Sequence, residues 1–311
     1  MKTKLFPEAQ PLTQGWLSVG NGHRMYWQTS GNPQGKPVVW LHGGPGSSAS
    51  PLHRRFFDPA VFWIIQFDQR GCGRSLPAGA ITHNETSDLI ADIECLREHL
   101  GLASWSVVGG SWGGALALLY AQAHCDRIER MLLRSPFLCT QTEIENFMEH
   151  PPESCRERWQ ALKSQVPAES PQSILEFGHQ VFCLEQDACR QAQLAEAWMA
   201  YEAAMNVYPA QAPMLGQVDP AALINRYRVQ SHYLIHKCFV SQSILAHAHA
   251  LAAIPLTLVH GDRDALCPFS NSQMIQQVLP HAKLVSVQGG GHDLTDAGML
   301  AASFEELGQW D

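Results

Sequence analysis

The chain has 311 residues, of which 45% are hydrophobic and 16% are charged. This composition suits about two globular domains, or one larger domain with an insertion, and excludes a disordered chain. The net charge is −8 and no basic stripe is present, so nucleic acid is not an expected partner. No apolar run approaches the roughly 20 residues that cross a bilayer, and Pro7 and Pro11 break the segment in which a signal peptide would be apolar. We therefore expect no membrane partner.

The nine cysteines are an odd number and have neither the spacing of a disulfide framework nor that of a zinc site. Reduced thiols are typical of the cytoplasm, which is the expected location. We expect no metal. No self-complementary apolar stripe is evident, so the sequence predicts no particular oligomeric state.

Short apolar runs alternate with helical patterns over most of the chain. An opening hairpin is predicted at Trp16–Val19 and Arg24–Thr29, around a Gly-Asn-Gly turn. The later runs are short and mostly apolar, as strands are when helices cover both faces of a sheet. These runs are Val38–Leu41, Trp63–Phe67, Trp105–Val108, Arg130–Leu133, Leu256–Val259 and Leu284–Val287. Helices are predicted at Ser87–Leu100, Ser111–Ala123, Ser270–Val278 and Leu300–Trp310. The alternation predicts an α/β fold with a mostly parallel, eight-stranded sheet and helices on both faces.

The strand pattern stops between about residues 140 and 250. This segment is rich in Glu, Gln, Ala, His and aromatic residues, and several prolines divide it. Within Gln191–Asn206, four apolar side chains fall on one helical stripe, namely Leu194, Trp198, Tyr201 and Met205. We predict a helical cap over residues 140–250, inserted into a core made of residues 1–139 and 251–311.

The strand at Trp105–Val108 leads into Gly109-x-Ser111-x-Gly113 and then into an apolar helical run. This pattern indicates the nucleophile elbow of an α/β-hydrolase. We expect Ser111 in a strained backbone conformation that projects its hydroxyl from the sheet. Side chains at positions 109 and 113 would collide across so sharp a turn, and glycine removes them. The alternative is a glycine-rich strand-to-helix loop without a catalytic role.

A serine nucleophile needs a base, and the base needs an acid that orients it. His292 lies on a glycine-rich loop after the last predicted strand, and it is the predicted base. Asp264 follows the preceding strand and is the predicted acid, with Asp262 as its rival. The order Ser111, Asp264, His292 is that of the α/β-hydrolases. The alternatives are local hydrogen bonding by the histidine and turn capping by either aspartate.

An oxyanion hole needs preorganised N–H donors. One donor is predicted from Trp112, the residue after the nucleophile. The other is predicted from Gly44, with Gly43 as the second choice, because glycines in this loop let bare backbone approach a substrate. A phosphate-binding loop is excluded, because neither glycine-rich phosphate motif occurs.

Four motifs together resemble the proline iminopeptidases, which are serine peptidases of the α/β-hydrolase fold that remove N-terminal proline. The motifs are HGGPG at 42–46, DQRGCGRS at 68–75, GGSWGG at 109–114 and DALCP at 264–268. The resemblance covers the core on both sides of the cap. It implies that Asp264 is the triad acid, and that Cys267 lies near the site without taking part in the chemistry.

Within the cap, the resemblance implies residues that bind substrate. A family glutamate that meets the proline amine corresponds to Glu202, in the run Trp198-Met-Ala-Tyr-Glu202. A second family glutamate corresponds to the neutral Gln230, which leaves a weaker hold on the amine. Arg134 and Phe137 correspond to residues that line the family's pocket, and Arg134 is expected to pair with Glu202. Gly43 is also assigned to substrate binding.

The expected activity is release of N-terminal proline from small peptides through a prolyl-enzyme, with no cofactor. Two rivals stay open. The first is an esterase, amidase or carbon–carbon-bond hydrolase with the same triad, because of Gln230 and because the segment Glu143–Arg158 departs from the family's aromatic-rich run. The second is a non-catalytic binding protein on the same scaffold.

Overall fold

Eight strands form one sheet in the order β1-β2-β4-β3-β5-β6-β7-β8 in the computed structural model, which describes residues 5–206 and 219–310. The pairs β1–β2 and β2–β4 are antiparallel, and all other neighbours are parallel. The strands are β1 (Thr13–Ser18), β2 (Arg24–Gly31), β3 (Lys36–Leu41), β4 (Phe62–Phe67), β5 (Trp105–Gly110), β6 (Ile128–Arg134), β7 (Leu256–Gly261) and β8 (Lys283–Val287). The predicted fold class is confirmed.

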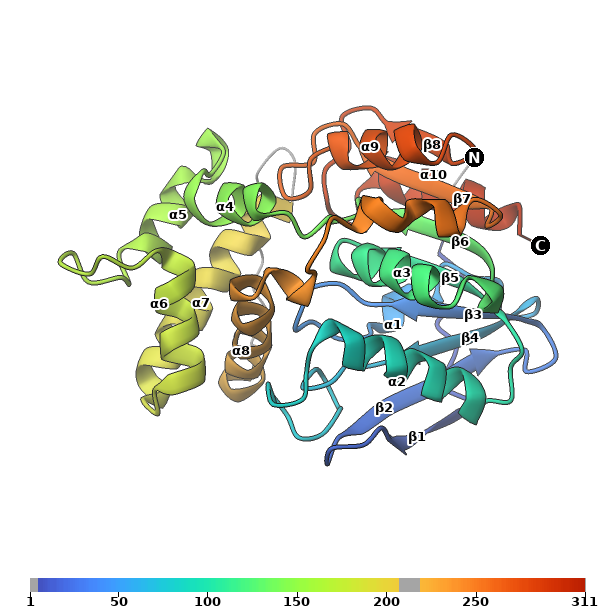
Figure 1. Cartoon of the computed structure of the whole chain (residues 1–311), viewed down its shortest axis with the longest axis horizontal. Coiled ribbons are helices and arrows are strands. Elements are labelled where there is room, and N and C mark those ends of the chain that lie inside the picture. Colours follow the sequence, from blue (N-terminus) through green and yellow to red (C-terminus); the bar gives the residue numbers. More distant parts are fainter. Residues whose placement is uncertain (1–4, 207–218, 311) are drawn as a thin grey trace.

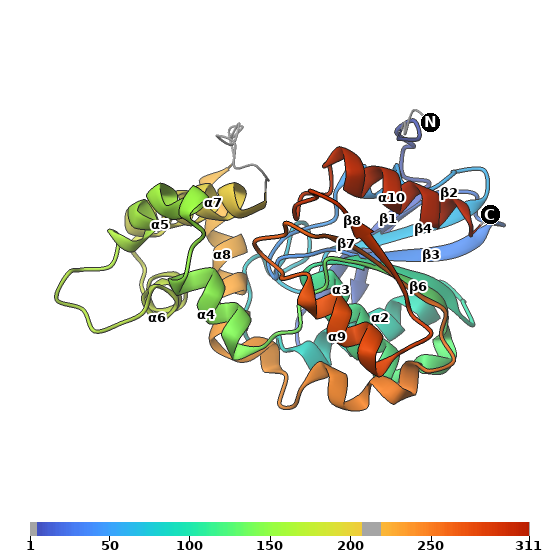
Figure 2. The same ribbon diagram turned by 90° about the horizontal axis from the view of Figure 1, so that it is seen from above.

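Helices cover both faces of the sheet (Figures 1 and 2). One face carries α2 (Thr86–His99), α3 (Trp112–Ala123) and α9 (Ser270–Val278), and the other carries α10 (Ala297–Gly308) and the short α1 (Pro51–Arg54). Alternate residues of a strand enter different cores. Val39 and Leu41 of β3 pack in the core with α2 and α3, whereas Val38 and Trp40 pack in the core with α10. Burial on both faces explains why the central strands are mostly apolar.

Several element boundaries differ from the prediction, and two starts differ by three residues. The last helix begins at Ala297 rather than Leu300, because the Asp296 carboxylate accepts the backbone N–H groups of the first turn. The first strand begins at Thr13 rather than Trp16, because its early residues also pair with β2.

The described residues between β6 and β7 are mainly helical. The helices are α4 (Gln141–Glu149), α5 (Arg156–Lys163), α6 (Ile174–His179), α7 (Ala188–Asn206) and α8 (Pro220–Ile235). They lie together to one side of the sheet in Figures 1 and 2. The four predicted stripe residues of α7 are all buried. Two short turns that follow, η4 (Lys237–Phe239) and η5 (Ile244–Leu251), pack against α2 and α3 respectively. The cap boundaries at 140 and 250 stay a prediction.

Three further short turns are η1 (Cys125–Arg127), η2 (Glu153–Cys155) and η3 (Gln180–Leu184). Over residues 5–206 and 219–310, no helix has the length and apolar character that crossing a membrane requires.

Candidate active site

Ser111 stands at the turn between β5 and α3. Its backbone has φ 56° and ψ −125°, a left-handed conformation that residues with a side chain rarely adopt. Glycines on either side permit the turn. A Cβ on Gly109 would collide with the carbonyl oxygen of Gly113, and a Cβ on Gly113 would collide with that of Leu41. The strained conformation predicted for Ser111 is confirmed.

His292 lies on the loop after β8 and bonds to Asp264, on the loop after β7. His292 Nδ1 is 2.7 Å from Asp264 Oδ2, while Asp264 Oδ1 accepts the N–H groups of Leu266 and Cys267. Burial raises the pKa of Asp264, but His292 and His260 outweigh it and hold that pKa well below its usual range. The carboxylate is therefore ionised at neutral pH. It follows that Nδ1 donates the proton in this bond and that Nε2 is left as the basic nitrogen.

Asp262, the rival acid, is engaged elsewhere. Its Oδ1 accepts the N–H of Gly289 at 2.7 Å, in the loop that leads to His292. The structure thus brings Asp264, and not Asp262, to the histidine. Asp262 instead fixes the path of the histidine loop.

His260, which the sequence prediction missed, is a second histidine beside the Asp264 carboxylate. This buried side chain lies at the end of β7, with Nε2 3.6 Å from Asp264 Oδ2. Its Nε2 donates to the carbonyl of Cys267 at 3.0 Å, and its Nδ1 is 2.7 Å from the Ser272 hydroxyl. These bonds hold the turn whose N–H groups bind Asp264.

Cys267 lies beside the serine, as the resemblance implies, with its Sγ 3.9 Å from Ser111 Oγ. Burial raises the pKa of this thiol well above its ordinary value. The thiol therefore stays protonated at neutral pH, when it is a poor nucleophile. Within the described part of the chain, no hydrogen bond joins Ser111 to His292; both side chains line the same cavity.

The loop after β3 brings bare backbone to Ser111. Gly44 has φ 119°, and a Cβ there would lie 2.7 Å from the nitrogens of Gly46 and Ser47, so the position requires glycine. Gly43 and Gly44 both line the cavity with Ser111. The N–H groups of Gly44 and Trp112 donate to no other described residue.

Gln69 joins this loop to the elbow helix. Its side-chain amide donates to the carbonyl of His42 at 2.9 Å, and its side-chain oxygen accepts the indole N–H of Trp112 at 2.9 Å. The Gln69 backbone N–H also donates to His42 Nε2 at 3.0 Å. Burial lowers the pKa of His42, which keeps its ring neutral and able to accept that bond. Gln69 thus links the loop that carries Gly44 to Trp112, the two residues that carry the candidate oxyanion donors.

Two cavities share Ser111, Gly44 and Glu202 on their linings. The larger has a volume of about 420 Å³ and is lined by residues that include His292, Arg134, Arg226 and Glu202. The smaller has a volume of about 40 Å³ and apolar walls that include Phe137 and Phe147, with Glu202 and Gln230 also on its lining. A cavity needs roughly 10–15 Å³ to hold one water molecule, so the small cavity accommodates a group of only a few heavy atoms.

Glu202, on α7, is held by three donors from α8. Arg226 Nη2 and the Tyr227 hydroxyl donate to Oε2 at 2.6 and 2.9 Å, and Gln230 Nε2 donates to Oε1 at 2.9 Å. The expected pair between Arg134 and Glu202 is therefore wrong, because α8 places Arg226 nearer to the carboxylate. The charge of Glu202 raises the pKa of Arg226 further, although burial opposes it.

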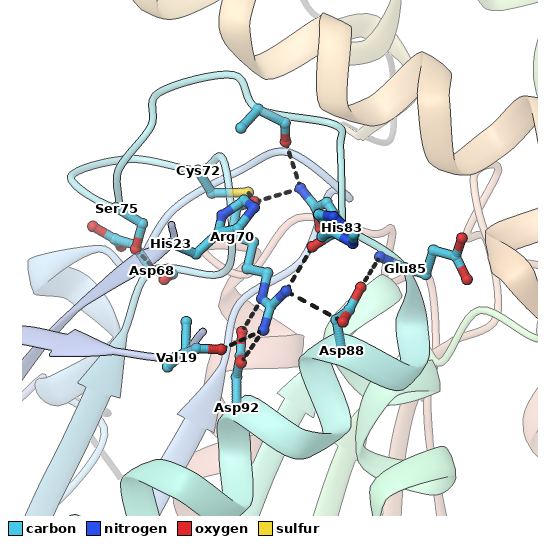
Figure 3. A network of polar contacts seen from close by, with 12 residues as sticks. Val19, His23, Asp68, Arg70, Cys72, Ser75, His83, Glu85, Asp88 and Asp92 are labelled. Atoms are coloured by element: carbon cyan, nitrogen blue, oxygen red, sulfur yellow. Dashed lines mark hydrogen bonds and ion pairs between the residues drawn. The ribbon is translucent and has the colours of Figure 1, made fainter. Parts of the chain in front are cut away.

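The DQRGCGRS motif lies beside the site and holds loops in place. Arg70 forms a bidentate pair with Asp92 of α2, at 2.7 and 2.8 Å, and also donates to the carbonyls of His83 and Val19 (Figure 3). Asp68 accepts the N–H of Ala49 at 2.8 Å, in the segment that follows HGGPG. The motif therefore supports the site from outside the cavity.

Comparison with known proteins identifies the family. The model of the alpha/beta hydrolase fold family matches residues 36–296. A proline iminopeptidase of Xylella fastidiosa is 39% identical over 292 residues, which cover 93% of each chain. The chain belongs to the proline iminopeptidase family. An Arabidopsis thaliana proline iminopeptidase is 36% identical, with 96% of this chain and 80% of the relative covered. The solved structure of a proline iminopeptidase-related protein from Thermus thermophilus has a TM-score of 0.60 at 21% identity, covering 95% of this chain and 97% of the other, and shows the fold alone.

One histidine pair with metal-ligand spacing was missed by the sequence prediction. His232 lies in the last turn of α8 and His236 directly follows the helix, with ring centroids 5.1 Å apart. Each donates to a backbone carbonyl, His232 to Asn84 at 3.1 Å and His236 to His232 at 2.8 Å. Among the residues that the structure describes, no group of three or more His, Cys, Asp or Glu side chains is placed to hold a metal ion.

Proposed function

We propose that this member of the proline iminopeptidase family is a serine aminopeptidase that releases proline from the N-terminus of short peptides. One arrangement carries the proposal. Ser111 lies where a cavity lined by His292, which is bonded to Asp264, meets a small apolar cavity with a carboxylate on its lining. The small cavity fits a five-membered ring, and Glu202 and Gln230 are the groups that would meet the ring nitrogen.

Gln230 offers this nitrogen a hydrogen-bond acceptor. The side-chain nitrogen of Gln230 donates to Glu202, and this bond distinguishes the nitrogen of the amide from its oxygen. That oxygen is buried and has no donor among the described residues. Buried polar atoms are rarely left without a partner, and the N–H of a proline amine would supply one.

The proposed reaction is acyl transfer in two steps. His292 Nε2 takes the proton of Ser111 as the hydroxyl attacks the prolyl carbonyl, and Asp264 holds the ring and stabilises the imidazolium. The Gly44 and Trp112 N–H groups receive the oxyanion, and each such donor is worth about 3–4 kcal/mol of transition-state stabilisation. His292 then protonates the leaving amine, and water releases proline by the same route. The bond between serine and histidine commonly tightens only when substrate binds.

The proposed location is the cytoplasm. All nine cysteines are free thiols, as is typical of a reducing compartment. The proposed partners are the peptide substrates.

A second candidate is an esterase or amidase that does not require a free amine. The pairing of Glu202 with Arg226 favours it, because the carboxylate charge is already balanced. In that case the small cavity would hold a neutral acyl group.

Three substrates separate the candidates: proline anilide, acetyl-proline anilide and a short acyl ester. The aminopeptidase should cleave proline anilide and leave the acetylated compound intact. Equal turnover of the two anilides would favour the second candidate. Ser111→Ala should abolish all turnover and all labelling by a fluorophosphonate, and labelling that survives in this variant would exclude Ser111 as the nucleophile.

A further inference from the structure

Arg134 is a buried cation whose hydrogen-bonding capacity is largely unused. It is the last residue of β6, only 5% exposed, and lines the large cavity with Ser111. Its Nε and Nη2 atoms are buried and have no hydrogen-bond partner among the described residues. Burial lowers the pKa of Arg134 to about 10, so the guanidinium still carries its charge at neutral pH.

The nearby carboxylates do not pair with the Arg134 guanidinium. Asp264 is bonded to His292, and Asp293 accepts both the N–H and the hydroxyl of Thr295. Within the described ranges, no carboxylate oxygen lies within 4.0 Å of the Arg134 nitrogens. A buried cation with unpartnered N–H groups is costly, which indicates that a bound ligand completes the arrangement.

The position of Arg134 identifies which part of a substrate it would meet. Arg134 pairs in register with Gly110, the residue before the nucleophile, and a Cβ on Gly110 would lie 3.6 Å from Arg134 Nη1. Arg134 lines the large cavity and is not among the residues that line the small one. If the prolyl ring occupies the small cavity, the leaving residue extends into the large one.

We infer that Arg134 binds the carboxylate of the leaving residue, so that the preferred substrates are prolyl dipeptides with a free C-terminus. This inference rests on the function proposed above. A guanidinium matches a carboxylate because both are planar and can form two parallel hydrogen bonds. In a dipeptide the carboxylate lies one residue from the bond that is cut. The dipeptide carboxylate is therefore the anionic group of the substrate that lies nearest to Arg134, beside the nucleophile elbow.

Prolylglycine and prolylglycinamide provide the test, because they differ only in the terminal charge. The wild-type enzyme should cleave prolylglycine with a kcat/KM at least about tenfold higher, mainly through a lower KM, as expected for a hydrogen bond to a charged group. Arg134→Gln should bring the ratio of the two kcat/KM values close to one. Arg130→Gln, at the far end of the same strand, is the matched control and should keep the wild-type ratio.

The outcomes are distinct from those of the proposed function. Equal kcat/KM for the two dipeptides in the wild-type enzyme would overturn the role of Arg134 and leave the aminopeptidase activity intact. Failure to cleave either dipeptide would overturn the proposed function itself. Equal loss of both activities in Arg134→Gln, with the ratio kept, would also overturn the inference. The wild-type comparison needs no variant, so it holds even if Arg134→Gln does not fold.

Discussion

Arg226 and Glu202 form a 2.6 Å ion pair inside the cavity beside Ser111. The carboxylate that is proposed to meet the substrate amine is thus already balanced by a guanidinium of this chain. Two consequences for substrate binding follow, one for each partner of the pair.

Replacing Glu202 tests whether the carboxylate reads the amine. Glu202→Gln keeps the size of the side chain and removes its charge. We expect proline anilide turnover to fall about tenfold or more, on the order of 1.4 kcal/mol, while turnover of a short acyl ester survives. Steady-state kinetics on both substrates measures this. Equal losses on the two would mean that Glu202 does not recognise the amine.

Replacing Arg226 tests the other side of the pair. Arg226→Met leaves Glu202 free to pair with the substrate, so KM for proline anilide should fall several-fold, on the order of 1 kcal/mol. An N-terminal amine loses its charge near pH 8. The kcat/KM for proline anilide, divided by that for an acyl ester, should therefore fall as the pH rises through 8, and it should fall more steeply in the variant, where the Glu202 charge is unopposed. An identical pH dependence in both proteins would exclude the effect.

The two aspartates after β7 should differ sharply in their effect on catalysis. Asp264→Asn removes the charge that orients His292, and kcat should fall by about 10⁴-fold, as for the acid of other serine triads. Asp262→Asn weakens only the bond to Gly289 and should leave most of kcat. Rates measured on proline anilide at one pH compare the two. A greater loss for Asp262→Asn would reverse the assignment.

The residues of the proposed triad could be predicted because their signals are local. The residues that define the elbow lie within five positions of the chain, because Gly109 and Gly113 must lack side chains for Ser111 to adopt its turn. His292 and Asp264 each follow an apolar run, and parallel strands end at one edge of the sheet. No long-range packing had to be known.

The surroundings of Glu202 depend on how α7 packs against α8, and this packing could not be predicted from the sequence. Arg226 and Gln230 lie four residues apart on α8 and therefore share a face, so a charged residue one turn before Gln230 was the available signal. Only the contact between α7 and α8 makes Arg226, rather than Arg134, the partner of Glu202. His260 was likewise concealed, because in sequence it is the end of an apolar strand.

The pair between Arg70 and Asp92 should contribute to stability rather than to chemistry. Both side chains are buried, 3% and 2% exposed, and Arg70 ties α2 to the DQRGCGRS loop (Figure 3). Arg70→Gln leaves the Asp92 carboxylate buried without a counter-ion, which should lower the free energy of unfolding by about 3–5 kcal/mol. Arg156→Gln is the matched control, because its pair with Glu153 is exposed and such pairs contribute about 0–1 kcal/mol. Urea unfolding of the two variants provides the comparison, and a loss below about 1 kcal/mol in Arg70→Gln would contradict this role of the motif.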